Sequence, residues 1–331
     1  MQIKSPPYII SSKIVHLIAE ISEELTRIEI NQKEIITPKL RKENRIKTLV
    51  GTLEIEGNFL GIEKVTAILE GKKVLGTMLE VAEVEGVIGA YKELEQYKFD
   101  ELDDLLKSHQ ILMNGILKNA GNFRGVNVGV GNHIAPAAKN VQYLMQNLFN
   151  WLKDSDEHSL IKSCVFHYEF EFIHPFSDGN GRIGRLWQSV ILYNWRAVFN
   201  AIPTESIVRD NQQKYYDTLE ECNSLGNSTK FIEFMLTILL DAIRKNIEKN
   251  KKYVHTNVPI NVPINVPIKR IDKILNLIQN NHRITIPQIA TKLKLTDKTI
   301  QRDLEKLKNA NILIRVGSLK TGSWKIINNK E

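Results

Sequence analysis

The sequence has few of the features that mark secreted, metal-bound or membrane-spanning proteins. Only two of its 331 residues are cysteines, Cys164 and Cys222, and they do not form a CxxC pair. A disulfide framework or a zinc ribbon is therefore not expected. No apolar stretch approaches the length of a membrane span, and residues 1–10 lack the apolar core of a signal peptide. We expect a cytoplasmic protein without a membrane partner.

Strand signals are also scarce before residue 257, because most segments have the apolar spacing of a helix. Helices are predicted around apolar stripes at residues 14–25, 65–69, 102–106, 141–152, 160–173 and 183–195. The strand candidate in this part is residues 126–134, an alternating and glycine-laced segment that suits a surface hairpin. The predicted fold class is therefore all-α with one hairpin.

Proline is concentrated in a repeat that divides the chain. The tetrapeptide Asn-Val-Pro-Ile occurs three times between residues 257 and 268. Proline at every fourth position removes backbone donors and prevents a continuous helix, which predicts an extended linker over residues 251–268. Beyond it, three helical stripes are followed by two short strand-like segments, the order of a winged helix-turn-helix domain. We assign this domain to residues 269–331.

The formal net charge of +7 is unevenly distributed. Residues 269–331 carry a net charge of about +9, and the first 268 residues about −2. A basic third helix and wing could contact the backbone of duplex DNA, although winged helices also dock proteins or form homodimers. The basic side chains of this helix and wing are Lys298, Arg302, Lys306, Lys308, Arg315 and Lys320.

One loop between two predicted helices is dense in ionisable groups and glycines. Residues 174–185 read His-Pro-Phe-Ser-Asp-Gly-Asn-Gly-Arg-Ile-Gly-Arg. Gly179 and Gly181 allow the backbone to approach a ligand, and the N–H groups that begin the next helix form an anion site. Arg182 and Arg185 are three residues apart, so both can reach a phosphate at that helix end.

The same loop contains a candidate base and a candidate metal ligand. Asp178 offers the hard oxygen that suits Mg²⁺, an ion that a polyphosphate would bring. His174 is the nearby group whose ordinary pKa suits proton removal from a hydroxyl near neutral pH. Together with the anion site and two arginines, these groups predict phosphoryl or nucleotidyl transfer. The structural alternative, a capped turn between helices, requires neither the histidine nor the second arginine.

The loop matches the pattern HxFx(D/E)GNGRxxR at every specified position, and in this it resembles the Fic (Fic/DOC) family of protein adenylyltransferases. The resemblance implies a Fic-fold helical core over residues 96–250 that transfers AMP from ATP to a protein hydroxyl and releases pyrophosphate. His174 would be the base, and Asp178 would hold Mg²⁺. A related branch that donates phosphate has lysine in place of Gly181. The nucleotide contacts implied within the loop are Asp178, Gly179, Asn180, Gly181, Arg182, Ile183, Gly184 and Arg185.

The resemblance continues on both sides of the loop. Residues 126–136 correspond to the family's flap, a hairpin that aligns the target segment. A tyrosine pair and an asparagine fall where the family contacts adenine and ribose, although an aromatic pair on a helix is more often part of a core. The nucleotide contacts implied outside the loop are Val130, Gly131, Asn132, His133, Tyr215, Tyr216 and Asn223.

A second motif precedes the core. Residues 52–58, Thr-Leu-Glu-Ile-Glu-Gly-Asn, match (S/T)xxxE(G/N), the inhibitory motif of one Fic subgroup. The resemblance implies an N-terminal helical region over residues 1–95, in which Glu56 accepts bidentate bonds from Arg185 and keeps it from the γ-phosphate. The alternative for Glu56 is a solvated carboxylate at a helix end. In some relatives the same glutamate activates water to remove AMP.

Three functions therefore remain open from the sequence. The first is an autoinhibited protein adenylyltransferase that uses ATP and Mg²⁺ and modifies a Ser, Thr or Tyr hydroxyl of a target protein or of itself. The second is an AMP-removing hydrolase on the same scaffold. The third is a DNA-bound regulator whose core only senses ATP, a function that would not require His174.

Overall fold

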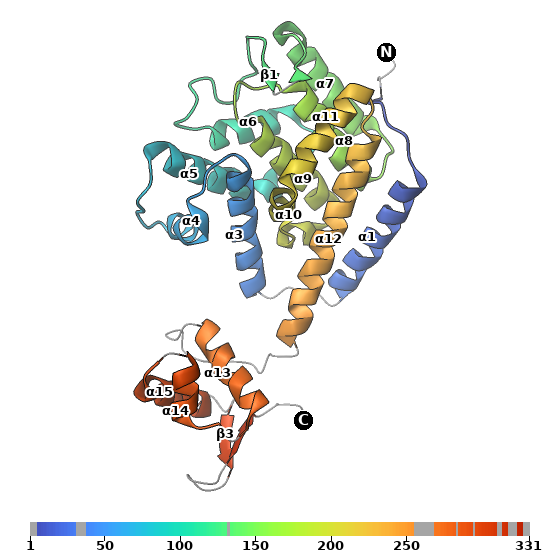
Figure 1. The fold of residues 1–331 in the computed structure, drawn as a ribbon. Coiled ribbons are helices and arrows are strands. Elements are labelled where there is room, and N and C mark those ends of the chain that lie inside the picture. The colour runs from blue at the N-terminus through green and yellow to red at the C-terminus, as the bar shows by residue number, and fades with distance from the viewer. Residues whose placement is uncertain are drawn as a thin grey trace. The chain divides into compact units, whose positions relative to one another are not determined.

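The computed structural model describes residues 5–30, 38–130, 133–254, 268–282, 284–293, 295–309, 313–316 and 323–326. The chain divides into two compact units, Met1–Lys251 and Lys252–Glu331 (Figure 1). The proposed linker at 251–268 falls mostly outside the described residues. The division of the chain into four segments, drawn from the sequence, stays a prediction.

The first unit is built almost entirely from helices, so the predicted fold class is confirmed. Each predicted apolar stripe lies within one of them. The helices are α1 (Ser12–Ile30), α3 (Pro38–Ile55), α4 (Gly61–Leu69), α5 (Met78–Lys92), α6 (Leu102–Leu112), α7 (Ala138–Asp154), α8 (Ser159–Ile173), α9 (Asn180–Trp195), α10 (Thr204–Asp210), α11 (Gln212–Leu225) and α12 (Thr229–Val254), with short 3-10 turns η1 (Leu94–Gln96) and η2 (Ala197–Ala201).

Helix α9 occupies the middle of this unit and packs most extensively against α8 (Figure 1). It also contacts α3, α6 and the two 3-10 turns, so it is enclosed on several sides. Trp187 and Ile183 are fully buried within it. A helix surrounded in this way buries residues around its circumference and not along a single stripe. The first turn of α9 is therefore held firmly, and that turn carries the loop identified from the sequence.

The start of α9 differs from the sequence-based expectation. Its apolar pattern begins at Ile183, but the helix begins at Asn180. Gly179 precedes it in the left-handed conformation, with φ of 81°, which favours a residue without a Cβ. Arg182 therefore belongs to the first turn of the helix and not to the preceding loop.

The C-terminal end of α3 is pressed against α10. A Cβ on Gly51 would lie 2.8 Å from the backbone nitrogen of Ser206, so only glycine allows the two helices to approach this closely. Gln212 on α11 adds a hydrogen bond of 2.9 Å from its Nε2 to the carbonyl of Ile55, the last residue of α3. These contacts fix the segment that carries the inhibitory motif beside α9.

The hairpin of the first unit is shorter than the alternating segment predicts. Strands β1 (Gly129–Val130) and β2 (His133–Ile134) pair antiparallel, with Gly129 opposite Ile134 and Val130 opposite His133. One further hydrogen bond, 3.2 Å from Ala135 N to Val128 O, extends the pairing. Gly131 and Asn132 lie outside the described residues.

The second unit contains the predicted three helices followed by two strands. These are α13 (Ile268–Asn280), α14 (Ile286–Leu293), α15 (Asp297–Asn309), β3 (Leu313–Val316) and β4 (Ser323–Ile326), with β3 and β4 antiparallel. Thr285 caps α14 through Gln288, whose backbone N–H lies 3.4 Å from the threonine Oγ1. Trp324 is buried in the core of this unit and donates from Nε1 to the Ile284 carbonyl at 2.9 Å. Within the described parts of the chain, no helix has both the length and the apolar character needed to cross a membrane.

Candidate active site

The candidate base lies at a sharp turn where α8 ends. His174 is the C-cap of α8, with φ of 49° and ψ of 61°, and among the described residues it alone has a positive φ without being glycine. This left-handed conformation costs energy for a residue with a side chain. It persists because neighbouring groups fix the turn, among them Arg124, whose Nε donates to the His174 carbonyl at 2.8 Å.

Arg124 is a positioning residue that the sequence analysis missed. It is 2% exposed, and its guanidinium donates to backbone carbonyls of the flap and of the end of α8. Burial lowers its pKa. An arginine in a loop is ordinarily expected to be exposed to solvent, so no local sequence pattern indicates that Arg124 is buried and positions this turn. Its acceptors are the carbonyls of Val126, Pro136, Ile173 and His174.

The underside of the loop rests on a second missed residue, His109 of α6. Its ring stacks on the buried Phe176 with centroids 3.6 Å apart and an angle of 5° between the planes. Nδ1 accepts a hydrogen bond of 2.8 Å from the backbone N–H of Gly121. A neutral ring therefore carries its proton on Nε2, which donates to the Asp178 carbonyl at 3.0 Å. Burial lowers the pKa of His109 to about 4, and this keeps the ring neutral.

The first turn of α9 forms the candidate anion site. Gly179 provides no side chain to cap the helix, so the leading N–H groups are left for a ligand. Arg182 and Arg185 are each 2% exposed and belong to this turn and the next. Ile183 is fully buried, so only its backbone could reach a nucleotide.

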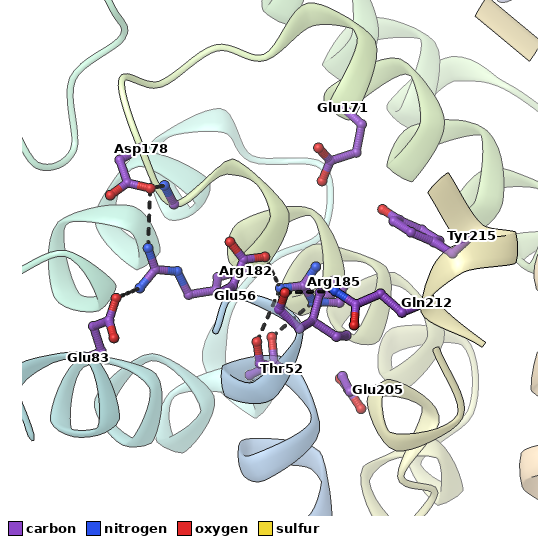
Figure 2. A network of polar contacts seen from close by, with 12 residues as sticks. Thr52, Glu56, Glu83, Glu171, Asp178, Arg182, Arg185, Glu205, Gln212 and Tyr215 are labelled. Atoms are coloured by element: carbon purple, nitrogen blue, oxygen red, sulfur yellow. Dashed lines mark hydrogen bonds and ion pairs between the residues drawn. The ribbon is translucent and has the colours of Figure 1, made fainter. Parts of the chain in front are cut away.

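Arg185 is held by the inhibitory motif (Figure 2). Its Nη2 lies 2.6 Å from Glu56 Oε1, and its Nε donates to Thr52 Oγ1 at 3.0 Å. The expected contact is present, but with one bond to the carboxylate and not two, because Nε is directed back to Thr52. A Cβ on Gly181 would lie 2.6 Å from Glu56 Oε1, so this carboxylate rests directly on the anion-binding turn.

The electrostatics of this pair favour two charged groups. Burial by itself would raise the pKa of Glu56, but the charge and hydrogen bond of Arg185 outweigh burial and lower it. Burial likewise opposes the charge on Arg185, and Glu56 reverses that effect, so the pKa of the guanidinium is raised. The ion pair is therefore charged across the physiological range.

Arg182 has a comparable arrangement. Its Nη1 lies 3.2 Å from Glu83 Oε1, and its Nη2 lies 3.3 Å from Asp178 Oδ1 (Figure 2). Glu83 in turn accepts a hydrogen bond of 2.9 Å from Asn58, the last residue of the inhibitory motif. Both arginines of the loop therefore contact carboxylates of the N-terminal region. Glu83 was missed because it belongs to α5 and to no motif.

Asp178 fits the role of a magnesium ligand. Its side chain is 53% exposed, and Oδ1 accepts from the Gly179 N–H at 2.6 Å as well as from Arg182. Among the described residues no hydrogen bond involves Oδ2, which leaves that oxygen available to a cation. No cluster of three or more His, Cys, Asp or Glu is found in this part of the chain. Mg²⁺ requires none when it binds through one carboxylate and the phosphates of its substrate.

The remaining candidate residues lie around the loop with different exposure. Tyr215 is buried, and its hydroxyl is 2.8 Å from Nε2 of the buried His167, so it belongs to the core. Tyr216 is 45% exposed and is the member of the pair that a ligand can reach. Asn223 Oδ1 accepts from the Tyr168 hydroxyl at 2.9 Å. His133 Nε2 lies 2.8 Å from the Phe172 carbonyl, which connects β2 to α8.

The neutral state of His109 predicts a pH effect on stability. Its folded pKa of about 4 lies below the ordinary value of 6.5, so the unfolded chain binds the extra proton between these pH values. The contribution of His109 should be complete above pH 6.5 and fall as the pH approaches 4, by up to about 3 kcal/mol. In urea unfolding at pH 7.5 and 5.0, the stability advantage of wild type over His109→Gln should shrink at the lower pH. His16→Gln, on an exposed face of α1, should follow wild type; an unchanged His109 advantage would contradict this account.

Comparison with known proteins agrees with the geometry of the loop and of the second unit. Residues 98–192 match the model of the Fic/DOC family, and residues 270–318 match that of the DeoR-like helix-turn-helix domain. The chain is 31% identical over 208 residues to a protein adenylyltransferase Fic of Culex quinquefasciatus. This match covers 60% of this chain and 40% of the relative. The protein of the same name in Nematostella vectensis is 31% identical over 192 residues, a match that covers 55% of this chain and 44% of the relative. The chain thus spans less than half the length of these relatives.

Solved structures extend the comparison to the whole chain. A fragment of Fic-1 from C. elegans shares the fold, with 22% identity and a TM-score of 0.60 over 73% of this chain and 72% of that one. The crystal structure of a Fic family protein from Desulfovibrio desulfuricans G20 is 35% identical, with a TM-score of 0.75, and covers 99% of this chain and 100% of that one. With the complete loop pattern on the end of α8 and the start of α9, these matches show that the chain belongs to the Fic family.

Proposed function

We propose that the chain is an autoinhibited protein adenylyltransferase, which transfers AMP from ATP to a Ser, Thr or Tyr hydroxyl of a target protein or of itself. The observation that carries this proposal is the loop between α8 and α9. His174 lies at the end of α8, and the loop leads to the uncapped N-terminus of α9, which carries two buried arginines. A base and an anion site on one loop suit attack on a phosphorus atom. The name of the curated relatives, protein adenylyltransferase Fic, supports the choice of AMP as the transferred group.

His174 would begin the reaction as a neutral imidazole. Burial lowers its pKa, with smaller contributions from Arg124 and His133 in the same direction. An unprotonated ring nitrogen can take the hydroxyl proton as the hydroxyl oxygen bonds to the α-phosphorus, while the bond from that phosphorus to the leaving pyrophosphate breaks. Mg²⁺ held by Asp178 and the phosphates would supply additional positive charge to the nucleotide.

The leading N–H groups of α9 and the two arginines would hold the phosphates in this proposal. Val130, His133, Tyr216 and Asn223 would border the rest of the nucleotide. Gly131 and Asn132 are included on their sequence position alone. Tyr215 would support Tyr216 from the core, since the two rings meet edge to face with centroids 5.2 Å apart.

Glu56 would restrain the enzyme by occupying the place of a phosphate. Its carboxylate pairs with Arg185 and rests on the turn at Gly181, which is where an anionic ligand of α9 would lie. ATP could still bind, but with Arg185 withheld its α-phosphorus would be misplaced, and misplacement by about 1 Å can cost on the order of 100-fold in rate.

Glu56→Gly should therefore raise self-modification several-fold or more. Intact-mass analysis of the full chain with ATP and Mg²⁺ measures the added AMP directly. Glu54→Gly is a matched control, because Glu54 lies on the same helix end but pairs with Arg209 at 2.7 Å. Equal rates of self-modification in wild type, Glu54→Gly and Glu56→Gly would show that Glu56 does not restrain the enzyme and that any restraint has another source.

His174→Ala, introduced into the Glu56→Gly chain, should abolish transfer and leave ATP affinity nearly unchanged. General-base catalysis typically contributes about 10² to 10⁴ in rate. ATP affinity should not change, because the phosphates would be held by α9 and the two arginines and not by His174. Transfer rates by intact mass and ATP affinity by calorimetry check both parts. His16→Ala should behave as the parent does. If the chain only senses ATP, the loss of His174 should change neither the transfer rate nor the ATP affinity.

Removal of AMP by water is a second candidate function, and the ionised state of Glu56 at the anion site favours it. A carboxylate beside the modified hydroxyl could accept a proton from an attacking water. Glu56→Gly chain that has been modified with AMP provides the substrate. Wild-type chain added in trans should release free AMP, and added Glu56→Gln chain should not. A mass that stays constant with both additions would exclude this activity for the self-modified chain.

We further propose that the second unit binds duplex DNA, as a DeoR-like helix-turn-helix domain would. Lys298 and Arg302 are exposed on α15, whereas Lys308 and Arg315 lie over the Trp324 ring at 5.5 and 4.6 Å. The side chain of Lys306 and all of Lys320 lie outside the described residues. The first two side chains are therefore the ones to test.

Replacement of Lys298 and Arg302 by alanine in the full chain should weaken DNA binding at all sequences. The slope of log affinity against log salt should decrease by about 2, since each phosphate contact contributes about 1. Fluorescence anisotropy with a labelled duplex at several salt concentrations measures both. Lys73→Ala, an exposed lysine of the first unit, is the control. If wild type shows no binding at low salt, docking of a protein or of a second copy becomes the function of this unit.

A further inference from the structure

Two buried polar atoms without partners lie together at the end of α8. Neither His174 Nδ1 nor Glu171 Oε1 has a hydrogen bond, and both are inaccessible to solvent. The other carboxyl oxygen, Glu171 Oε2, is 3.9 Å from His174 Nδ1. Unsatisfied buried groups are costly, and catalytic hydrogen bonds that are long in a free enzyme often shorten when substrate binds. The two side chains are therefore placed to form a bond that is incomplete in this state.

The position of Glu171 is set by helix geometry and by a glycine. It lies in the last turn of α8, three residues before His174, whose left-handed backbone brings Nδ1 to within 3.9 Å of the carboxyl. A Cβ on Gly184 would lie 2.9 Å from Glu171 Oε1, so the glycine leaves the space that the carboxyl occupies. Figure 2 shows this carboxyl directed toward the region where Glu56 and Arg185 meet.

We propose that Glu171 is the positioning residue of His174, whose carboxylate accepts the Nδ1–H of the imidazole and leaves Nε2 free to take the proton of the target hydroxyl. This inference rests on the proposed adenylyltransferase activity. The tautomer of a histidine is set by the bond that its other nitrogen makes, and a base oriented by a third group is a recurrent arrangement in nucleophilic catalysis. The backbone of Glu171 also faces the ring and raises the pKa of His174.

The charges around the pair determine when Glu171 can accept that bond. Burial raises its pKa to about 7, Arg185 of α9 opposes this, and Glu56 beside α3 adds to it. Tyr215 of α11 faces Glu171, and the ring of His174 faces Arg124, His133 and Glu56. A protonated Glu171 could donate to Nδ1 and leave the proton of the ring on Nε2, the wrong nitrogen for a base. The rate should therefore rise as Glu171 ionises, near pH 7.

The kinetic test uses the full chain with Glu56→Gly, so that transfer is measurable. Glu171→Leu removes the acceptor and should lower the rate at saturating ATP about 10- to 100-fold, less than removal of the base itself, with little change in the KM for ATP. The rise in rate with ionisation of Glu171 should also disappear; it lies below pH 7 in this chain, because the like charge of Glu56 is gone. Glu171→Gln keeps an acceptor that does not titrate, so it should recover part of the rate and none of the pH dependence.

Glu169 provides a matched control on the same helix. Burial raises its pKa to about 7 as well, but His174 is not among the groups that shift it. Glu169→Leu should keep both the rate and the rise in rate that Glu171 causes. A rise that survives Glu171→Leu and disappears with Glu169→Leu would overturn the proposal.

A second measurement does not depend on activity. Ring carbon resonances of ¹³C-histidine-labelled chain report the tautomer of His174, assigned by the signal lost in His174→Ala. At pH 8.5 wild type should show the Nδ1–H tautomer, and Glu171→Leu should shift the population toward Nε2–H. An unchanged tautomer in Glu171→Leu would refute the positioning role whether or not the chain transfers AMP. If the tautomer shifts and no variant modifies itself with ATP, the proposed function fails while the positioning of His174 by Glu171 stands.

Discussion

A buried guanidinium must be matched by negative charge, and the arrangement of the first unit follows from how Arg185 meets that requirement. Its side chain is 2% exposed, and Glu56 supplies a carboxylate oxygen at 2.6 Å. Loss of one partner from a buried pair leaves an uncompensated charge, which typically costs about 3–5 kcal/mol. Glu56 therefore stabilises the unliganded protein, and a nucleotide that displaces it must offer Arg185 an equivalent anion. Polyphosphate is such an anion, so the proposed restraint and the proposed substrate would satisfy the same electrostatic demand.

Other buried polar contacts lie beside the ion pair. Arg185 also donates to Thr52 of α3, and further inside the core the Tyr91 hydroxyl donates to Glu205 Oε1 at 3.2 Å. Glu205 is fully buried and accepts from Ser189 as well. Because Gly51 packs against the backbone of α10 and Thr52 is bonded to Arg185, α3 cannot move as a body without cost. Release of the restraint is therefore expected to be local.

Glu56 is suited to a local release because it follows the last residue of α3. Its side chain is 25% exposed, and the next residue, Gly57, has φ of 87°, which ends the helix at that point. A rotation of the Glu56 side chain would free Arg185 while Thr52 kept its bond to Nε. Arg182 would keep its ion pairs with Glu83 and Asp178 during such a rotation, although the charge of Glu56 also acts on it. The two arginines are thus controlled separately.

The sequence predicted those parts of the site in which the chemistry lies within one short segment. The loop from His174 to Arg185 could be identified because its ionisable groups are contiguous. The segment around Glu56 could be identified because it matches a motif of the family that the loop resembles. His109, Arg124 and Glu83 could not, since they reach the loop from distant segments and the contacts arise only on folding. Helical spacing also cannot tell which of two adjacent tyrosines is buried, and the structure assigns Tyr215 to the core.

Burial, together with nearby guanidiniums, keeps the histidines in and around the loop neutral. The buried guanidiniums of Arg124, Arg182 and Arg185 lie near it, and burial lowers the pKa of His109, His167 and His174. A proton added to one of these rings would be opposed both by desolvation and by the arginines. The acceptors recorded for Arg124 are backbone carbonyls, whereas Arg182 and Arg185 pair with carboxylates of the N-terminal region. Positive charge is therefore concentrated at the proposed anion site, the proposed base keeps its lone pair, and Glu56 is the carboxylate that pairs with Arg185 in this structure.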